Sequence, residues 1–219
     1  MKLIAAAVLA LALSPSMLHA QFLGEGPRDQ FRDTSVLKPP AGAKVAVIVF
    51  EDLGCPGCAY AHPIELETSD KTRVPILRYD FPIAGHVWTF QGAVCARYLQ
   101  DKVNPKLAEQ YRSDVFAAQR NIASRDDLQR FNESWFPKHG QKMPFVIDPD
   151  GSLTKKVQAD YDLGRRLNIT QTPTVVVVSD HKYQVVCGTP EATDPTQLLP
   201  VVEAAVAETK SVKPVARRQ

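Results

Sequence analysis

Two cysteines three positions apart, Cys55 and Cys58, stand in the stretch FEDLGCPGCAYAHP, directly after the apolar run AKVAVIVF. The β-branched run predicts a strand buried on both faces, and the residues after DLG predict a helix that begins near Cys55. A thiolate at the start of a helix is stabilised by unpaired backbone N–H groups and by the helix dipole. We therefore expect Cys55 to exchange with partner thiols and Cys58, one turn deeper, to be the resolving thiol.

Two other interpretations of this cysteine pair stay open. A purely structural crosslink would close a loop too short to constrain much of the unfolded chain. A metal such as copper or zinc could use Cys55, Cys58 and His62, but structural zinc normally takes four ligands, and no second pair of closely spaced Cys or His residues appears. Redox exchange is the favoured chemistry, and it needs no organic or metal cofactor.

The first twenty residues indicate export. One lysine, an apolar run and Ala20 as a cleavage residue predict a secretory signal. The apolar run is too short to span a bilayer comfortably and no other segment is long enough, so we expect an exported protein that is not itself transmembrane. In an exported protein disulfides persist. The formal net charge of +2 gives no reason to expect nucleic acid as a partner.

The order of expected elements defines the fold class. The pattern is strand, helix, strand, a block of helices, two strands and a final helix, which is the order of an α/β thioredoxin-like fold with an inserted all-helical domain. The expected division of the chain is a signal peptide at 1–20, an extended lead at 21–44, a thioredoxin-like domain at 45–86 and 169–210, an inserted helical domain at 87–168, and a disordered tail at 211–219.

A Thr-Pro pair precedes the strand in ITQTPTVVVV. Alone it would be an ordinary proline at the entry to a strand. Together with the CPGC motif and the inserted helices, it makes the chain from about Ala43 to Glu208 resemble the DsbA-like family of exported thiol-disulfide oxidoreductases. The resemblance implies that Thr172 and Pro173 form a substrate-binding loop with a cis peptide bond before the proline, whose backbone groups pair with an extended substrate.

The same resemblance implies partners. It predicts a periplasmic donor of disulfides to unfolded or partly folded exported proteins with thiols, reoxidised by a membrane partner linked to quinones. The alternatives are a reductase or isomerase kept reduced by a membrane protein, or a chaperone-like module that uses the helical block. Isomerases of this kind usually carry an N-terminal dimerisation domain, and the lead before Val45 is too short for one.

The chain departs from the family pattern at the buried acid that many relatives carry six positions before the first cysteine, where Val49 stands here. The nearest acids are Glu51 and Asp52, and Asp52 matches an aspartate common in the family. Strand alternation points Glu51 to the same side as Val49, so Glu51 and Asp52 are candidates for proton transfer to Cys58.

The dipeptide between the cysteines, Pro56 and Gly57, is a second departure. Both residues belong to the candidate substrate-binding surface, but the strongly oxidising members of the family have a histidine in the second place. Gly57 has no side chain that could stabilise the Cys55 thiolate and Pro56 has no backbone donor, so we expect a milder oxidant.

Four further residues are candidates on weaker grounds. Phe81 lies within the YDFP segment, which resembles the family's DFP segment, and His86 follows it; both are expected at the rim of the site. A lone histidine there is more often a surface or packing residue than a catalytic one. Cys95 and Cys187 are either two buried apolar thiols or a structural disulfide that ties the helical block to the sheet.

Overall fold

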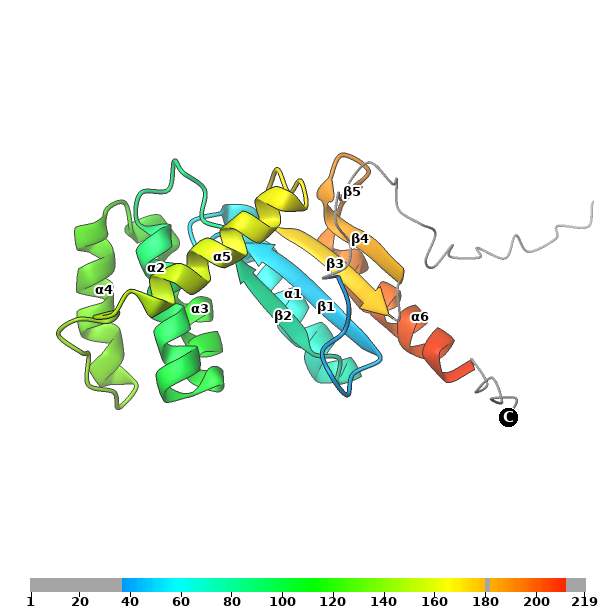
Figure 1. Ribbon diagram of the computed structural model, residues 1–219, viewed down its shortest axis with the longest axis horizontal. Helices are drawn as coiled ribbons and strands as arrows, with labels where there is room; N and C mark the ends of the chain where they lie inside the picture. The colour runs from blue at the N-terminus through cyan, green and yellow to red at the C-terminus, as the bar shows by residue number, and fades with distance from the viewer. Residues whose placement is uncertain (1–36, 180–181, 212–219) are drawn as a thin grey trace, which may run out of the picture.

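A five-stranded mixed sheet organises the molecule (Figure 1). The computed structural model describes residues 37–179 and 182–211, so the expected signal peptide and most of the expected lead and tail lie outside the described residues. The strands are β1 (Val45–Glu51), β2 (Ile76–Asp80), β3 (Thr174–Ser179), β4 (Lys182–Thr189) and β5 (Ala192–Thr193). Their order in the sheet is β2-β1-β3-β4-β5; β1 pairs with β2 in parallel, and every other pairing is antiparallel.

Within the described part of the chain, six α-helices surround or extend this sheet, at the places where the sequence predicts helical periodicity. They are α1 (Pro56–Thr72), α2 (Thr89–Tyr98), α3 (Pro105–Ala118), α4 (Arg125–Lys138), α5 (Ser152–Arg166) and α6 (Leu198–Ser211). A single π-helical turn, Leu99–Val103, continues α2. Helix α1 runs through Pro63 without ending. Among the described residues, none of the helices combines the length and apolar character needed to cross a membrane.

The two faces of the sheet are covered by different helices. Strand β1 is buried along its whole length, as its uninterrupted apolar run predicts. Alternate residues such as Val47 and Val49 pack with Leu198 and Val202 of α6 and with Ile64 of α1. The intervening residues, such as Ile48, pack with side chains of α5. Figure 1 shows α5 across one face of the sheet, with α1 and α6 behind the other.

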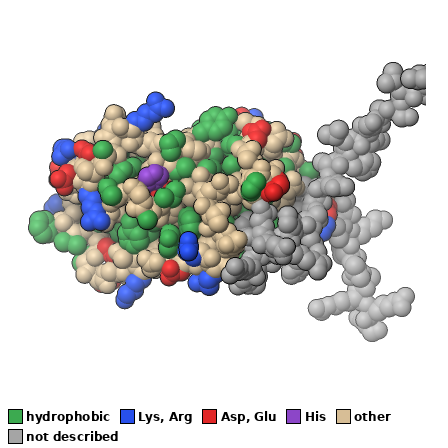
Figure 2. Space-filling view, turned by 90° about the horizontal axis from the view of Figure 1, so that it is seen from above, with side chains coloured by type: hydrophobic (Ala, Val, Ile, Leu, Met, Phe, Trp, Pro, Cys, Tyr) green, Lys and Arg blue, Asp and Glu red, His purple; other side chains and the backbone are tan. Residues whose placement is uncertain are grey.

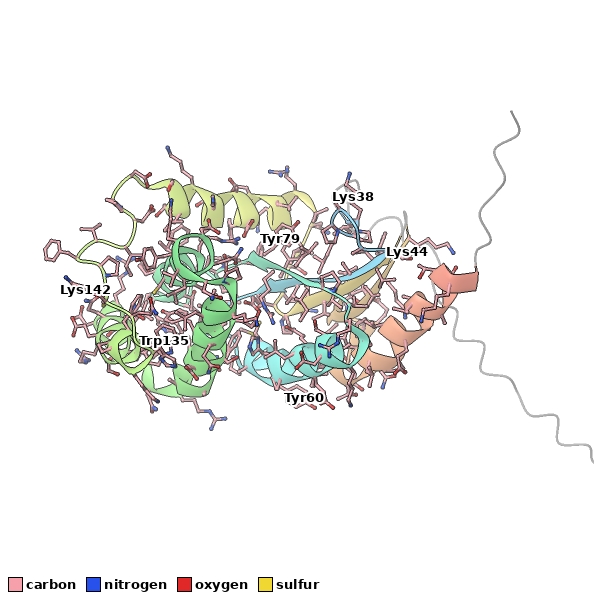
Figure 3. All side chains as sticks on the ribbon, turned by 90° about the horizontal axis from the view of Figure 1, so that it is seen from below. Lys38, Lys44, Tyr60, Tyr79, Trp135 and Lys142 are labelled. Carbon is pink, nitrogen blue, oxygen red and sulfur yellow. The ribbon has the colours of Figure 1, made fainter. Side chains whose placement is uncertain are left out.

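Helices α2, α3 and α4 form a second packed region beside β2, seen at the left of Figure 1. At its centre the rings of Tyr111 and Trp135 meet edge to face, with centroids 5.0 Å apart. Figure 3 shows Trp135 within this group of helices and Tyr79 between the sheet and α5. Cys55 and Cys58 belong to the same apolar cluster as Trp135, so the cysteine pair lies where the helical region meets the sheet.

Helix α5 joins these two regions. Its first turns pack against α2, through Leu153 and Val157, and its later residues Tyr161 and Leu163 cover the sheet. The expected insertion at 87–168 therefore includes α5, although this helix also packs on the sheet and completes its core. The short strand β5 has no counterpart among the expected elements, because two residues are too few to carry a periodic pattern.

Candidate active site

The turn that carries the cysteines is fixed at both of its ends. Strand β1 ends at Glu51, and the N–H of Cys55 then donates to the carbonyl of Asp52 at 3.0 Å. Pro56 occupies the first position of α1, where its missing N–H costs no helical hydrogen bond. From the helical region, Gln119 Nε2 donates to the carbonyls of Leu53 and Cys55 at 3.0 and 3.3 Å. Cys55 is therefore held at the N-terminus of α1, as the sequence predicts.

The two cysteines have opposite electrostatic surroundings, although both are free thiols here. The hydrogen bond from the Cys58 thiol, together with Thr172 and the backbone N–H groups of Gly57 and Cys58, lowers the pKa of Cys55 from 9.0 to about 6 against the effect of burial. Burial, followed by the hydrogen bond with Cys55 and the charge of Cys55, raises the pKa of Cys58 well above 9.0. At neutral pH Cys55 is therefore largely a thiolate and Cys58 a thiol.

The Thr-Pro loop lies against the first cysteine. The Thr172–Pro173 peptide bond is cis, and the thiol of Cys55 lies 3.2 Å from the carbonyl oxygen of Thr172. Gly57 approaches the same loop so closely that an added Cβ would lie 3.1 Å from Pro173 Cδ and 3.6 Å from Cys55 Sγ. Residues that are 117 positions apart are thus brought together in the arrangement that the sequence analysis expected.

Glu51 and Asp52, the two candidate proton carriers, have very different partners. The Glu51 carboxylate is buried and accepts from two guanidinium groups, Arg78 at 2.8 Å and Arg112 at 2.7 Å. Its charge is the smallest of the influences that raise the pKa of Cys58. Glu51 does point toward the face of the sheet that holds Val49, but both of its oxygens are already engaged.

Asp52 is bound instead by groups of the site itself. Its backbone N–H lies 3.5 Å from Cys58 Sγ, and its carboxylate side chain is fully buried. Each carboxylate oxygen accepts two hydrogen bonds. Oδ1 accepts from Gly54 N–H at 2.6 Å and His86 Nδ1 at 2.9 Å, and Oδ2 accepts from Ile83 N–H at 2.5 Å and Thr89 Oγ1 at 2.9 Å. Asp52 thus ties the cysteine turn to the segment between β2 and α2.

His86, expected only at the rim, is one of these partners, while Phe81 is a buried core residue. The Phe81 ring stacks on Tyr161 of α5, with centroids 4.9 Å apart. The His86 side chain is 34% exposed. Figure 2 looks onto the end of the sheet where β1 ends and α1 begins, and it shows a histidine on this face, with charged side chains mainly toward the margins.

A network of buried ion pairs, here called the ion cluster, lies next to the cysteine turn. Arg112 is 1% exposed and bridges Glu51 at 2.7 Å and Asp80 at 2.8 Å. Arg78 joins Glu51 to α1 and α3, and Arg97 extends the network to α5. The other members are Glu65 of α1, Glu109 of α3 and Asp160 of α5. Burial raises the pKa of Glu65 to about 7 and that of Asp160 to about 6.

The structure does not bring His62 to the cysteines as a third metal ligand. His62 bonds Ser113 Oγ at 2.8 Å, and burial lowers its pKa to about 4. Among the described residues, the one group of three ligand atoms within 4.8 Å of one another is Glu51, His62 and Glu65, without a cysteine. Because Arg78 already bridges the two carboxylates, a cation there would meet a buried positive charge.

Cys95 and Cys187 lie in separate apolar clusters. Cys95 belongs to the cluster that contains the cysteine turn and the helices, and burial raises its pKa to about 12. Cys187 belongs to the cluster between the sheet and α6, where burial also raises its pKa. These positions favour two buried apolar thiols over the structural disulfide considered as the alternative.

Comparison with known proteins agrees with this geometry. A family model described as Thioredoxin matches residues 40–196, so the chain belongs to this thioredoxin family. No curated protein sequence matches the chain significantly.

Solved structures similar to the chain include a DsbA variant from Pseudomonas aeruginosa, with 18% identity, a TM-score of 0.58, and coverage of 80% of this chain and 92% of that one. A periplasmic thioredoxin-like protein from Salmonella enterica serovar Typhimurium has 16% identity, a TM-score of 0.57 and coverage of 77% and 88%. The structure of alpha-DsbA1 from Wolbachia pipientis has 16% identity, a TM-score of 0.56, and coverage of 78% of this chain and 92% of that one. At such identities the likeness shows the fold, and it confirms the predicted thioredoxin-like fold with inserted helices.

Proposed function

We propose that this chain is an exported thiol-disulfide oxidoreductase that donates disulfides to partly folded proteins through Cys55 and Cys58. The main support for the proposal is the difference between the pKa values of the two cysteine thiols. One has its pKa lowered to about 6 at a helix N-terminus, and the other is a buried thiol with a raised pKa. The Thr172–Pro173 loop beside Cys55 supports it, because an extended substrate segment could pair with the backbone there.

The exchange needs no reactant besides the substrate's two thiols. A substrate thiolate attacks Cys55 Sγ in the oxidised enzyme, a substrate–Cys55 disulfide forms, and the Cys55–Cys58 bond breaks with its electron pair on Cys58. The second thiolate of the same substrate then attacks the substrate sulfur of the mixed disulfide, and Cys55 leaves as a thiolate. The substrate is oxidised by two electrons, and the enzyme is left with both cysteines reduced.

The low pKa of Cys55 favours this direction, because a stable thiolate is a good leaving group. The value of about 6 lies between those of thioredoxin, about 7, and the strongly oxidising DsbA, about 3.5. Together with the absence of a side chain at Gly57, it supports a milder oxidant than DsbA. A reductase or isomerase kept reduced by a membrane partner would use the same site in the opposite direction.

Export and partners are part of the proposal. The secretory pattern in residues 1–20 supports export, and one structural relative is a periplasmic thioredoxin-like protein. An exported oxidant must be reoxidised after each turnover, so we propose a membrane redox partner that accepts its electrons. The expected substrates are unfolded or partly folded exported proteins with thiols.

The test is a stoichiometric oxidation assay. The purified protein, oxidised at Cys55 and Cys58, is mixed with a reduced unfolded protein that contains two cysteines, and disulfide formation is followed by mass. Wild type should transfer one disulfide per molecule, Cys55→Ser should transfer none, and Cys187→Ala should match wild type. A folded, fully oxidised wild type that transfers nothing would overturn the proposal. Thiol trapping in cells then gives the direction: a mainly oxidised pair indicates a donor and a mainly reduced pair a reductase.

A further inference from the structure

We propose that His86, oriented by Asp52, is the proton acceptor for the substrate thiol that attacks Cys55. The inference rests on the proposed function and deepens it, because it names a further catalytic residue of the same site. His86 comes from the segment between β2 and α2, outside both the CPGC motif and the Thr-Pro loop.

The hydrogen bonds of Asp52 fix the tautomer of His86. Asp52 Oδ1 and Oδ2 already accept from Gly54 N–H, Ile83 N–H and Thr89 Oγ1, so this carboxylate acts as an acceptor only. His86 Nδ1 lies 2.9 Å from Asp52 Oδ1 and must therefore donate. The lone pair of the imidazole is left on Nε2. A carboxylate that holds a histidine through Nδ1 in this way is the arrangement that makes Nε2 a general base in other enzymes.

The ring of His86 packs against the cysteine turn. His86 Nδ1 would lie 3.1 Å from a Cβ added to Gly54, so the imidazole packs directly on the residue that precedes Cys55. A larger side chain at position 54 would displace the ring. The Thr172 carbonyl contacts Cys55 from the strand β3 side, whereas His86 enters from the β2 side of the sheet. An incoming thiol at Cys55 would thus lie between the substrate-binding loop and the histidine.

The surroundings of His86 leave Nε2 available. Its side chain is 34% exposed, and within residues 37–179 and 182–211 Asp52 is its one ion-pair partner. Of the ionisable groups on the packed segments, Asp52 contacts His86 directly and Arg125 of α4 contacts the next residue, Val87. The Arg125 guanidinium donates to the carbonyl of Val87 at 3.1 Å, and within the described residues it makes no hydrogen bond with His86. The imidazole is therefore partly exposed, and within the described residues its Nε2 has no hydrogen-bond partner.

The proton transfer fits both directions of exchange. The S–H proton of the substrate thiol moves to His86 Nε2, the thiolate so formed attacks Cys55 Sγ, and the Cys55–Cys58 bond breaks with the electron pair on Cys58. The imidazolium then releases this proton to water, and the Asp52 carboxylate stabilises it in the interval. In the reverse reaction the imidazolium returns a proton to the substrate thiolate that leaves Cys55. The histidine thus changes the rates of both directions and leaves the equilibrium between them unchanged.

The experiment compares wild type with His86→Asn, whose side-chain amide retains a donor toward Asp52 but supplies no base. Second-order rates of oxidation of a small dithiol such as dithiothreitol are measured from pH 6 to pH 10. We expect a loss of about tenfold or more at pH 6.5, consistent with general-base catalysis. The loss should shrink toward unity above about pH 9, where thiols ionise unaided. His139→Asn is the matched control, because His139 also lies 3.3 Å from an aspartate, Asp114, but belongs to the helical region.

Two further measurements separate this role from a structural one. The equilibrium constant with glutathione should be the same for wild type and His86→Asn, and imidazole in the buffer should restore rate to His86→Ala at pH 6.5. A rate loss of equal size at every pH, or a shifted equilibrium constant with unchanged rates, would overturn the inference. A folded His86→Asn variant that oxidises dithiothreitol at pH 6.5 as fast as an active wild type would also overturn the inference. If the wild-type protein is itself inactive, the result contradicts the proposed function, and it is distinguished in this way from a failure of the inference about His86.

Discussion

Two neighbouring carboxylates at the end of β1 serve two different regions of the molecule. Glu51 points into the ion cluster, where Arg78 and Arg112 occupy both of its oxygens. Asp52 points into the cysteine turn, where its carboxylate binds backbone N–H groups, a hydroxyl and a partly exposed histidine. Because β1 ends at Glu51 and the cysteine turn begins at Asp52, one step along the chain separates a side chain that joins the helices to the sheet from one that organises the site.

The two regions also differ in how their charges are balanced. In the ion cluster, guanidinium groups meet carboxylates from β1, β2, α1, α3 and α5, and the central pairs of Arg112 with Glu51 and Asp80 are almost completely buried. Around the cysteines, the developing charge on Cys55 is met by N–H groups and by the Cys58 thiol, and the sulfur remains within reach of a substrate.

The largest effect that separates the two regions is expected for Arg112→Met. The substitution leaves Glu51 and Asp80 buried without their shared cation, so the free energy of unfolding should fall by about 3–5 kcal/mol. Urea unfolding measures it. The control is Arg130→Met, which removes an exposed pair with Asp127 and should cost less than about 1 kcal/mol. Equal losses in the two variants would mean that the ion cluster contributes no more than a surface pair.

A smaller effect is expected for Glu51→Gln, which keeps hydrogen-bonding capacity but removes a charge. We expect a loss of about 1–2 kcal/mol in the free energy of unfolding. Because the charge of Glu51 raises the pKa of Cys58, its removal should lower that pKa slightly, and disulfide transfer per folded molecule should stay near wild type. Transfer that falls as far as in Cys55→Ser would instead identify Glu51 as an obligatory proton carrier and erase the distinction between the two regions.

Local patterns in the sequence were enough to predict the sheet, the helices and the cysteine turn. The apolar run and the CPGC motif are local signals, whereas the place of the Thr-Pro loop beside Cys55 was expected only from the family resemblance. The ion cluster left only a weak local signal, Arg78 and Asp80 inside the apolar pattern RVPILRYDFP, because its partners come from five separate elements. The pairing of Asp52 with His86 was missed for the same reason, since 34 residues separate them.

The two cysteines of one motif have opposite ionisation at neutral pH, and the proposed exchange depends on this difference. It is tested most directly by alkylating the reduced protein with iodoacetamide in short pulses between pH 4 and pH 10 and locating the label by mass. The rate at Cys55 should rise through a midpoint near pH 6, while Cys58 remains unmodified beyond pH 9. A Cys55 midpoint near 9, or the same profile for both cysteines, would contradict the account.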